Sequence, residues 1–394
     1  MKFSTVKLGD YLYIKGRIGW KGLKKSEYLE QGEYRIINGE ALVVDGINWN
    51  KAGFITKERY EESPEIMLQE EDILLSKDGT IGKIGFVDKL EQPTTVASGI
   101  FVIRNLKPEI INTRFIYYFL CSKYFKDFVT MRTEGSVIPH LYQKDFVDFD
   151  FPLPSKEIQR KIVSILDDIS SKIDINKEIN NNLEQQAKAL YKDWFFDFSP
   201  FSSNGNLPDG WRFGLVGDII QLHDSKRVPL SGAERDKMAK VYPYYGATSL
   251  MDYVDNYLFD GIYLLLGEDG SVIDKKGFPI LQYVEGKFWV NNHAHIITGK
   301  NGFSVEQLYL LFSLTNVQSI VTGAVQPKIS QTNLKKLPVI IPSEKDLKKF
   351  DVIVQPIFAQ IRNLRAENNK LSVIRDSLLT KLMSGEIDVS NIDL

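Results

Sequence analysis

Residues 135–155 read GSVIPHLYQKDFVDFDFPLPS, and residues 323–343 read GAVQPKISQTNLKKLPVIIPS. The two stretches align without a gap at an offset of 188 residues (323 − 135), so one chain carries the same passage twice. A repeat of this length predicts two structural units of the same kind rather than one continuous domain. The identical pairs are Gly135/Gly323, Val137/Val325, Pro139/Pro327, Gln143/Gln331, Pro154/Pro342 and Ser155/Ser343.

The repeat continues at the same offset through residues 155–195 and 343–383. In both segments apolar side chains recur at spacings of three and four residues, the stripe of a long amphipathic helix. A proline–serine pair before each segment suits a helix N-terminus, and Gly385 is placed to end the second helix. Helices of this length need a partner for the apolar seam, so we expect them to pair as an antiparallel coiled coil. The residues expected in that pairing are Ile162, Ile165, Ile169, Ile173, Leu183, Leu190, Phe350, Ile357, Ile361, Leu364, Leu371 and Leu378.

Two features disturb these helical stripes. Pro356 lies inside the second one and should kink or locally unwind the helix, because proline lacks the N–H of the helical hydrogen bond. The pairs at 180–181 and 368–369 are both Asn-Asn and fall at the same position of the repeat. A polar pair inside a seam can fix its register, and the same residues could equally face solvent.

Strand and turn signals precede each helix. DILLSKDGTIGKIGFV at 72–87 corresponds to IYLLLGEDGSVIDKKG at 262–277: an apolar strand, an Asp-Gly turn and a second strand. TTVASGIFVIR at 94–104 likewise corresponds to KFWVNNHAHIIT at 287–298. We therefore expect an α+β chain with two mixed, β-rich globular domains separated by two long helices. The expected boundaries are 1–152 for the first globular domain, 153–197 for the first helix, 198–210 for a linker, 211–341 for the second globular domain, 342–385 for the second helix and 386–394 for a tail.

Composition restricts the class of protein. The 394 residues are 43% hydrophobic and 25% charged, which predicts two or three folded domains. The single Cys121 excludes a disulfide framework and a cysteine-built zinc site within one chain. A net charge of −2 argues against a protein that is basic all over, yet permits a localised anion-binding face. No apolar run has bilayer length and the start of the chain lacks a signal-peptide pattern, so we expect a cytoplasmic protein.

Catalytic motifs are missing where an enzyme would need them. The chain has neither the phosphate-binding GxxxxGK[ST] nor GxGxxG, and no Pro-Pro dipeptide of the kind found in DNA amino-methyltransferases. The triplets at 274–276 and 285–287 fit an acid-x-Lys nuclease pattern, but a chain this charged produces them by chance. His293 and His295 would point to one face of a strand, as a metal pair might. Without carboxylates or cysteines at ligand spacing, a structural or DNA-contacting role is the stronger interpretation, and we expect no metal.

The order of short motifs carries a resemblance along the whole chain. SKDGTIGKIGFV, YPYYGATSLMDYV, LLLGEDGS, NNHAHIIT, LYKDWFFDF followed by LPDGW, and the closing LLTKLMSGEI together resemble the specificity subunit of a type I restriction-modification system. The resemblance implies a non-catalytic chain in which each globular domain is a target recognition domain for one half of a split, asymmetric DNA site. It implies that the helices set the spacer between the half-sites and dock two methyltransferase subunits. Two restriction/translocase subunits would join them, and S-adenosylmethionine and ATP with Mg would be used by those other subunits.

Residues that contact DNA can only be nominated by chemistry. Basic side chains suit phosphate contacts, and amides, hydroxyls and rings at turns suit base edges, although each could equally be an ordinary surface or core-edge residue. Two other classes stay open: a scaffold that bridges proteins without reading DNA, and an autonomous nuclease or methyltransferase. The phosphate candidates are Lys15, Arg17, Lys21, Lys24, Lys226, Arg227, Lys275, Lys276 and Lys328, and the base-edge candidates are Lys77, Thr80, Lys83, His140, Tyr244, Tyr245, Asn291, Asn292 and His293.

Overall fold

Both long amphipathic segments form helices in the computed structural model. Helix α5 spans Lys156–Phe195 and helix α10 spans Glu344–Met383, 40 residues each. Gly385 follows α10 with a positive φ of 77°, the left-handed conformation expected of a helix stop. Helix α10 continues through Pro356, so the expected local unwinding is wrong. The carbonyl of Val352 loses its helical N–H partner at this proline, but that side of the helix is exposed and water can satisfy it.

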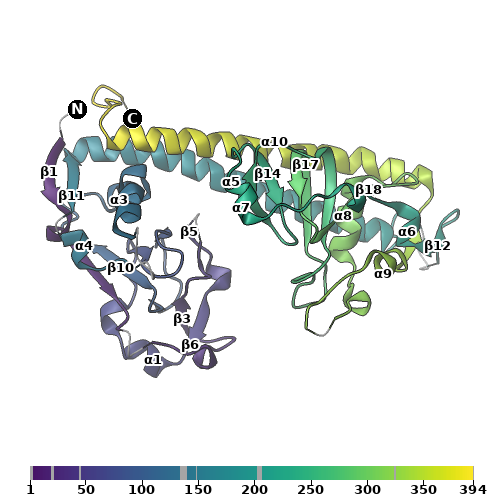
Figure 1. Cartoon of the computed structure of the whole chain (residues 1–394), viewed down its shortest axis with the longest axis horizontal. Coiled ribbons are helices and arrows are strands. Elements are labelled where there is room, and N and C mark those ends of the chain that lie inside the picture. The colour runs from purple at the N-terminus through teal and green to yellow at the C-terminus, as the bar shows by residue number, and fades with distance from the viewer. Residues whose placement is uncertain are drawn as a thin grey trace. The chain divides into compact units, whose positions relative to one another are not determined.

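The structure describes residues 3–18, 22–43, 46–133, 140–147, 149–201, 206–323 and 325–393. The chain divides into two units, each with one globular domain and a stretch of each long helix (Figure 1). Unit 1 comprises residues 1–174 and 368–394, and unit 2 comprises residues 175–367.

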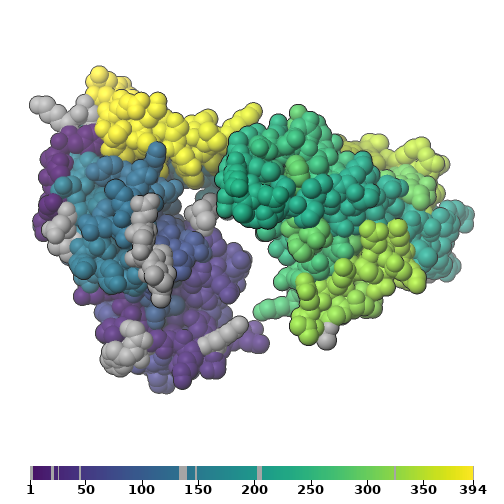
Figure 2. All heavy atoms as spheres, in the orientation of Figure 1, coloured from purple at the N-terminus to yellow at the C-terminus, as the bar shows by residue number. Residues whose placement is uncertain are grey.

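In unit 1 the start of α5 and the end of α10 share one hydrophobic core. Ile162 and Leu166 of α5 and Leu382 of α10 are buried together with Phe119 of the globular domain. Figure 2 shows the yellow end of α10 lying against the blue part of this domain. The globular domain and both helix stretches are therefore held by the same apolar core.

In unit 2 the end of α5 and the start of α10 share a second core. The ring of Phe195 lies 4.9 Å from that of Phe350, and both are buried with Phe312 of the globular domain. Within each unit the two helix stretches therefore run in opposite directions. Of the residues expected in the pairing, Ile162, Ile173, Phe350, Ile361 and Leu364 are buried, and Ile165, Ile169, Leu183, Leu190, Ile357, Leu371 and Leu378 are half-buried.

Asparagines take part in the helix packing of both units. In unit 2 the buried Asn176 donates from Nδ2 to Glu367 Oε2 at 2.9 Å. In unit 1 Asn368 donates from Nδ2 to the carbonyl of Ile173 at 3.1 Å. Within the repeated Asn-Asn pairs, the first residue of each pair is half-buried and the second is exposed. The first asparagine of each pair therefore lies at the helix packing, and the second faces solvent, so each of the two interpretations holds for one residue of a pair.

The globular domain of unit 1 is built from short strands. A ribbon of β1 (Phe3–Lys7) and β11 (Asp150–Pro154) leads into α5, and an antiparallel sheet has the order β2-β10-β7-β8. A second sheet has the order β6-β3-β9, and β4 pairs with β5. The other bounds are β2 (Leu12–Gly16), β3 (Tyr34–Ile37), β4 (Leu42–Val43), β5 (Gly46–Ile47), β6 (Gly53–Ile55), β7 (Ile73–Ser76), β8 (Ile84–Phe86), β9 (Thr94–Val96), β10 (Ile100–Asn105), α1 (Lys57–Glu61), α2 (Thr113–Cys121), α3 (Lys123–Thr133) and α4 (Lys144–Val147).

The globular domain of unit 2 repeats this plan with a larger sheet. A ribbon of β12 (Arg212–Leu215) and β19 (Pro338–Ile341) leads into α10, and a six-stranded sheet has the order β13-β18-β16-β17-β14-β15. The other bounds are β13 (Ile220–Leu222), β14 (Tyr242–Tyr245), β15 (Leu250–Val254), β16 (Phe259–Gly267), β17 (Leu281–Val290), β18 (Ala294–Gly299), α6 (Val216–Ile219), α7 (Gly232–Arg235), α8 (Val305–Leu314) and α9 (Gln331–Lys335).

The strand orders show that the sequence repeat is a repeat of topology. The order β2-β10-β7-β8 of unit 1 matches β13-β18-β16-β17 of unit 2, and every pair in both sets is antiparallel. The mixed α+β architecture and the strand–turn–strand predicted at 72–87 are confirmed. In unit 2 the second strand begins only at Leu281, because a further turn follows the Asp-Gly turn.

The segment expected to be a linker, residues 198–210, belongs partly to the core of unit 2. The rings of Phe198 and Phe201 lie 5.6 and 5.1 Å from that of Trp211, and both side chains pack against the core of unit 2. The described part of this segment is therefore anchored by aromatic packing despite its many small and polar residues. Among the described residues, no helix is both long and apolar enough to cross a membrane.

Candidate nucleic-acid interface

An exposed turn connects β7 to β8 in unit 1, and we call residues 77–83 the Asp78 turn. Ser76 braces it from within: its hydroxyl donates to the carbonyl of Thr80 at 2.7 Å and accepts from the N–H of Lys83 at 2.8 Å. Gly79 takes a positive φ of 67°, which glycine adopts without steric strain. Asp78, Gly79 and Thr80 are exposed, so this rigid turn presents a carboxylate and a hydroxyl at the surface.

The matching turn of unit 2 follows β16, and we call residues 268–271 the Asp269 turn. Gly270 again has a positive φ, here 84°. A hydrogen bond from the Gly270 N–H to the carbonyl of Pro327 at 3.0 Å ties the turn to the repeated passage. The two turns therefore occupy the same place in the two repeats.

The repeated passage holds both turns by the same backbone bond. In unit 1 the N–H of Leu141 donates to the carbonyl of Lys77 at 3.2 Å. In unit 2 the N–H of Ile329 donates to the carbonyl of Glu268 at 2.8 Å. Leu141 and Ile329 are 188 positions apart, and both acceptors directly precede the turn aspartate. One structural task of the duplicated passage is thus to fix an Asp-Gly turn in each unit.

A histidine contacts the aspartate in each turn. The Nδ1 atom of His140 contacts Asp78 in unit 1, and Nδ1 of His293 lies 2.6 Å from Oδ1 of Asp269 in unit 2. A carboxylate only accepts hydrogen bonds, so Nδ1 carries the proton in both pairs. His140 comes from the repeated passage, whereas His293 comes from the segment before β18. The two units therefore build the same pair from different parts of the sequence.

The interior support of the Asp269 turn is ionic. His295 Nδ1 lies 2.6 Å from Asp224 Oδ2, and His295 Nε2 lies 2.8 Å from the carbonyl of Ile329. Asp224 also accepts from Gln331 Nε2 at 2.6 Å. Arg227 and Lys328 pair with Glu268 at 2.6 and 3.2 Å. This network fastens the strand, the turn and the repeated passage of unit 2 to one another.

Electrostatics keep this network ionised. Burial is the largest single effect and raises the pKa of the Asp224 and Glu268 carboxyls, but the hydrogen bonds and charges of their partners, with His295 first for Asp224 and Arg227 first for Glu268, together outweigh it. Both pKa values therefore lie below the ordinary carboxyl range. The two carboxylates and His295 are the one group of metal-ligating type that the described residues bring together. Because Arg227 and Lys328 already balance the charge, we interpret the group as a buried salt-bridge network.

The corresponding support in unit 1 is apolar. The ring of Phe101 occupies the strand position of His295, one residue into β10 as His295 is one residue into β18. The ammonium of Lys77, the counterpart of Glu268, lies 5.1 Å from the centre of that ring. Gly16 lies beside both side chains. The two units thus keep one backbone arrangement around the turn and support it by different chemistry.

The repeated framework agrees with the comparison to known families. The model of the type I restriction modification DNA specificity domain matches residues 2–185 and 208–373. The chain belongs to this family. Both matches include an Asp-Gly turn and the passage that holds it, so the family domain occurs twice, once per repeat.

Individual relatives align over most of the chain. The MjaIX specificity subunit of Methanocaldococcus jannaschii is 27% identical over 337 residues, which cover 78% of this chain and 76% of the relative. The MjaVIII specificity subunit of the same organism is 24% identical over 425 residues, covering 99% and 94%. The crystal structure of a type I S subunit from M. genitalium has 18% identity and a TM-score of 0.48, covering 97% of this chain and 96% of that one.

In this specificity-domain protein, the unit 1 residues that the sequence nominated for DNA contact divide into two groups. Lys77, Thr80, Lys83 and His140 meet at the Asp78 turn, and Lys83 Nζ donates to the carbonyl of Gly39 at 3.0 Å. The other unit 1 candidates lie away from the turn, are buried, or fall outside the described residues. Lys15 lies in β2 with its ammonium 5.9 Å from the centre of the Tyr13 ring, Lys24 is exposed near Glu27, Arg17 is buried, and Lys21 lies outside the described residues.

The unit 2 candidates divide in the same way. Arg227, Asn292, His293 and Lys328 surround the Asp269 turn, where Arg227 donates to the carbonyl of Asn292 at 3.2 Å. The remaining candidates lie elsewhere. Lys226 is exposed beside Arg227, Lys275 and Lys276 are exposed on the turn after the Asp269 turn, Tyr245 is half-buried with its ring 5.9 Å from that of Phe288, and Tyr244 and Asn291 are buried.

Three of the DNA-contact candidates need correction, because their side chains are buried and are not accessible to DNA. Arg17 donates from Nε to the carbonyl of Val96 at 3.2 Å inside unit 1. The hydroxyl of Tyr244 accepts from the N–H of Leu230 at 3.1 Å, and Asn291 Oδ1 accepts from the N–H of His293 at 2.9 Å. Sequence reasoning also missed Asp78, Asp269, Asp224 and Glu268 as members of these sites. Asp224 and Glu268 reach His295 from distant positions in the chain, so the search for carboxylates at ligand spacing along the sequence did not find them.

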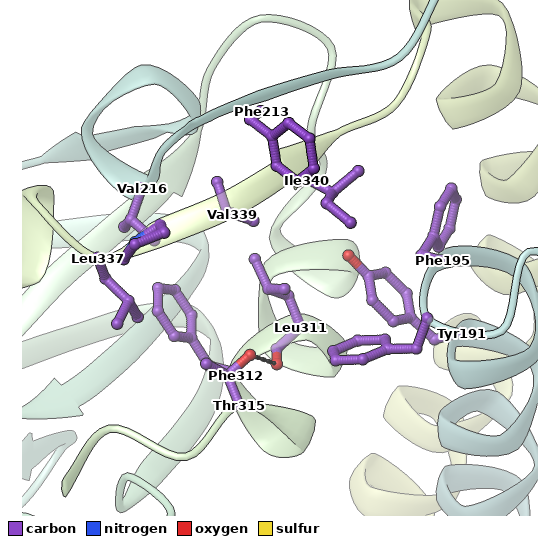
Figure 3. Close-up of a pocket in the computed structure, with 12 residues that line it drawn as sticks. Tyr191, Phe195, Phe213, Val216, Leu311, Phe312, Thr315, Leu337, Val339 and Ile340 are labelled. Carbon is purple, nitrogen blue, oxygen red and sulfur yellow. Dashed lines mark hydrogen bonds between the residues drawn. The ribbon is translucent and has the colours of Figure 1, made fainter. Parts of the chain in front are cut away.

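Unit 2 also carries an apolar cavity of about 310 Å³ where the end of α5 meets the ribbon β12/β19 (Figure 3). Tyr191 and Phe195 line it from the helix, and Leu311 from α8. Phe213 stands at its edge with 77% of its surface exposed. The wall formed by α5 is thus aromatic, and the large apolar side chain of Phe213 is left uncovered.

A second cavity occupies the corresponding place in unit 1. Met383 and Ser384 of the α10 end stand 188 positions from Phe195 and Phe196, and they line it beside Thr5 and Pro152 of the ribbon. Its other lining residues include Lys123 and Asp127, so this cavity is more polar than that of unit 2. The repeat therefore produces two cavities of equal position and unequal chemistry.

Proposed function

We propose that the chain is the DNA sequence-specificity subunit of a type I restriction-modification complex. Each globular domain acts as a target recognition domain for one half of a bipartite, asymmetric site in double-stranded DNA. The observation that carries this proposal is the pair of Asp-Gly turns, each held by the same passage and each close to basic side chains. A duplicated reading surface with different side chains suits two different half-sites.

The long helices supply the spacer in this proposal. An antiparallel coiled coil formed by α5 and α10 would set the distance between the half-sites and dock two methyltransferase subunits. Buried apolar residues of both helices in each unit support such pairing. Two restriction/translocase subunits would complete the assembly. The chain itself would be non-catalytic, with S-adenosylmethionine and ATP with Mg bound by the other subunits.

A protein–protein scaffold without DNA readout is the second candidate. The exposed Phe213 at the rim of an apolar cavity favours it, because such a patch suits a protein partner. A mobility-shift assay with duplex DNA and the methyltransferase partner separates the two. Binding to one bipartite sequence over others supports readout, whereas assembly without sequence preference supports the scaffold.

Mapping methylated adenines in cells that carry the chain and its methyltransferase partner tests the proposal directly. Methylation at one bipartite, asymmetric sequence is the expected result, because each unit then contributes one half-site. Methylation at a single uninterrupted sequence, or none that depends on this chain, would contradict it.

Lengthening both helices should lengthen the spacer. Four residues inserted after Asn176 and four after Leu364 add about one helical turn, or roughly 6 Å, to an antiparallel pair. This equals about two base pairs at roughly 3.4 Å each. We expect methylation at the same half-sites with a spacer one or two base pairs longer. The control inserts four residues after Asn206, outside both helices, and should leave the spacer unchanged. An active helix variant that still methylates sites with the original spacer would show that the helices do not set the distance between the half-sites.

Charging the rim of the unit 2 cavity should weaken partner binding. Phe213→Glu removes an exposed aromatic side chain, so the fold should tolerate it, while a partner would have to bury the carboxylate. We expect about 10-fold or greater loss of affinity for the methyltransferase subunit, measured by calorimetry. Val241→Glu, also at an exposed apolar position of unit 2, is the matched control. Equal binding by both variants would exclude the cavity rim from the interface.

A further inference from the structure

The turn aspartates are not used to build their turns. In the neighbouring turn of unit 2, Asp274 Oδ1 accepts from the N–H groups of Lys276 and Phe278 at 2.8 and 2.9 Å. This is the usual structural role of an aspartate in a turn. Among the described residues, neither Asp78 nor Asp269 accepts such a bond from a backbone N–H. Within the described part of the chain, the two carboxylates are therefore not needed to hold the turn backbone.

Both carboxylates are instead oriented by an imidazole at the surface. His140 is itself restrained, since its ring lies 4.5 Å from that of Tyr142. The side chain of Asp78 stays 43% exposed and that of Asp269 20% exposed, so a ligand can reach each carboxylate. The pair occurs in both units although the two histidines occupy unrelated positions. A packing accident in one unit would not explain its appearance in the other.

An oriented, ionised carboxylate selects its ligand by hydrogen-bond polarity. It only accepts, so it favours the exocyclic amino groups that cytosine and adenine present in the major groove. It repels the O6 acceptor of guanine and the O4 acceptor of thymine. The histidine N–H holds the carboxylate in place, and the nearby cations Lys77 and Lys328 reduce its repulsion by DNA phosphates. Such a group can distinguish bases but cannot serve as a phosphate contact.

We propose that Asp78 and Asp269 are base-reading residues, each accepting a hydrogen bond from the exocyclic amino group of a cytosine or adenine, one in each half-site. His140 and His293 are positioning residues that hold the two carboxylates. This inference rests on the proposed function and adds to it the chemical group that each unit recognises. It also requires that the Asp-Gly turns face the major groove.

Asparagine substitution tests the acceptor, because an asparagine side chain both donates and accepts. In the complete methyltransferase complex, Asp78→Asn should relax one base position in one half-site, and Asp269→Asn one position in the other. A lost base contact corresponds to roughly 5- to 150-fold in discrimination at that position. The unaltered half-site and the spacer should stay as they were. Asp10→Asn and Asp260→Asn, at exposed positions away from the turns, are the controls and should methylate the original sequence.

Base analogues test the same contact with the unaltered protein, so a variant that fails to fold does not leave the question open. Purine in place of adenine, or 2-pyrimidinone in place of cytosine, removes only the exocyclic amino group. At positions other than the methylated adenine, whose amino group is itself the methyl acceptor, one analogue per half-site should reduce methylation by the same factor, and its position identifies the base. The inference is overturned if the unaltered complex methylates a bipartite site while both asparagine variants and every analogue leave its sequence preference unchanged. If the unaltered complex shows no bipartite site at all, the proposed function itself fails.

Discussion

Replacing His295 by phenylalanine should lower the free energy of unfolding of unit 2 by about 3–5 kcal/mol, because it leaves the buried Asp224 carboxylate without its main partner. His295 is fully buried and contacts acceptors with both ring nitrogens. Its loss also removes the bond to the carbonyl of Ile329, and thus one tie between strand β18 and the repeated passage. Phenylalanine fills the space, as Phe101 does in unit 1, so the effect would come from lost charge pairing rather than from a cavity.

Amide hydrogen exchange and chemical unfolding of the full chain measure this effect. Protection of the Ile329 N–H should fall in His295→Phe, while the Leu141 N–H of unit 1 keeps its protection. His223→Phe is the matched control, because the ring of His223 is half-buried, lies 2.8 Å from the hydroxyl of Thr298 and 5.6 Å from the ring of Tyr263, and pairs with no carboxylate among the described residues. We expect it to cost under about 1 kcal/mol. Equal effects of both substitutions would show that the ionic network does not stabilise the Asp269 turn.

The sequence predicted those features that depend on periodicity. Stripes at spacings of three and four located α5 and α10 to within a few residues, and the Asp-Gly dipeptides located both turns. Such features arise from neighbours along the chain, which a sequence displays directly.

Contacts between distant segments were not predictable in this way. Asp224 and His295 are 71 residues apart, and nothing local indicates that they meet. Arg17 is a second example of a long-range contact that local sequence does not predict. A basic residue in a basic stretch suggests a surface position, but the fold buries Arg17 against Val96. Burial depends on which strands become neighbours, and a single amino-acid sequence does not reveal that pairing.

Ile173→Asp should separate the role of the helix seam from that of the globular cores. Ile173 is only 4% exposed and accepts a bond from Asn368 of α10 at its carbonyl, yet it belongs to neither of the large cores. A carboxylate at this site would be buried without a counter-charge, at a cost of about 3–5 kcal/mol. We expect the helices to lose their packing there while each globular domain stays folded. Assembly with the methyltransferase subunit should fail, as native mass spectrometry of the mixed proteins would record.

The expected effect of Ile173→Asp depends on the burial of this side chain, and Ile175, two residues further along α5, provides the control. Ile175 has 51% of its surface exposed, so Ile175→Asp introduces the same charge on the same helix without desolvating it. If α5 and α10 form a continuous coiled coil, only Ile173→Asp should abolish assembly, since a seam tolerates charge on its outer face and not within it. Equal assembly by both variants would mean that the middle of the helices is not a packed seam, and the spacer would then have to be set by the globular domains.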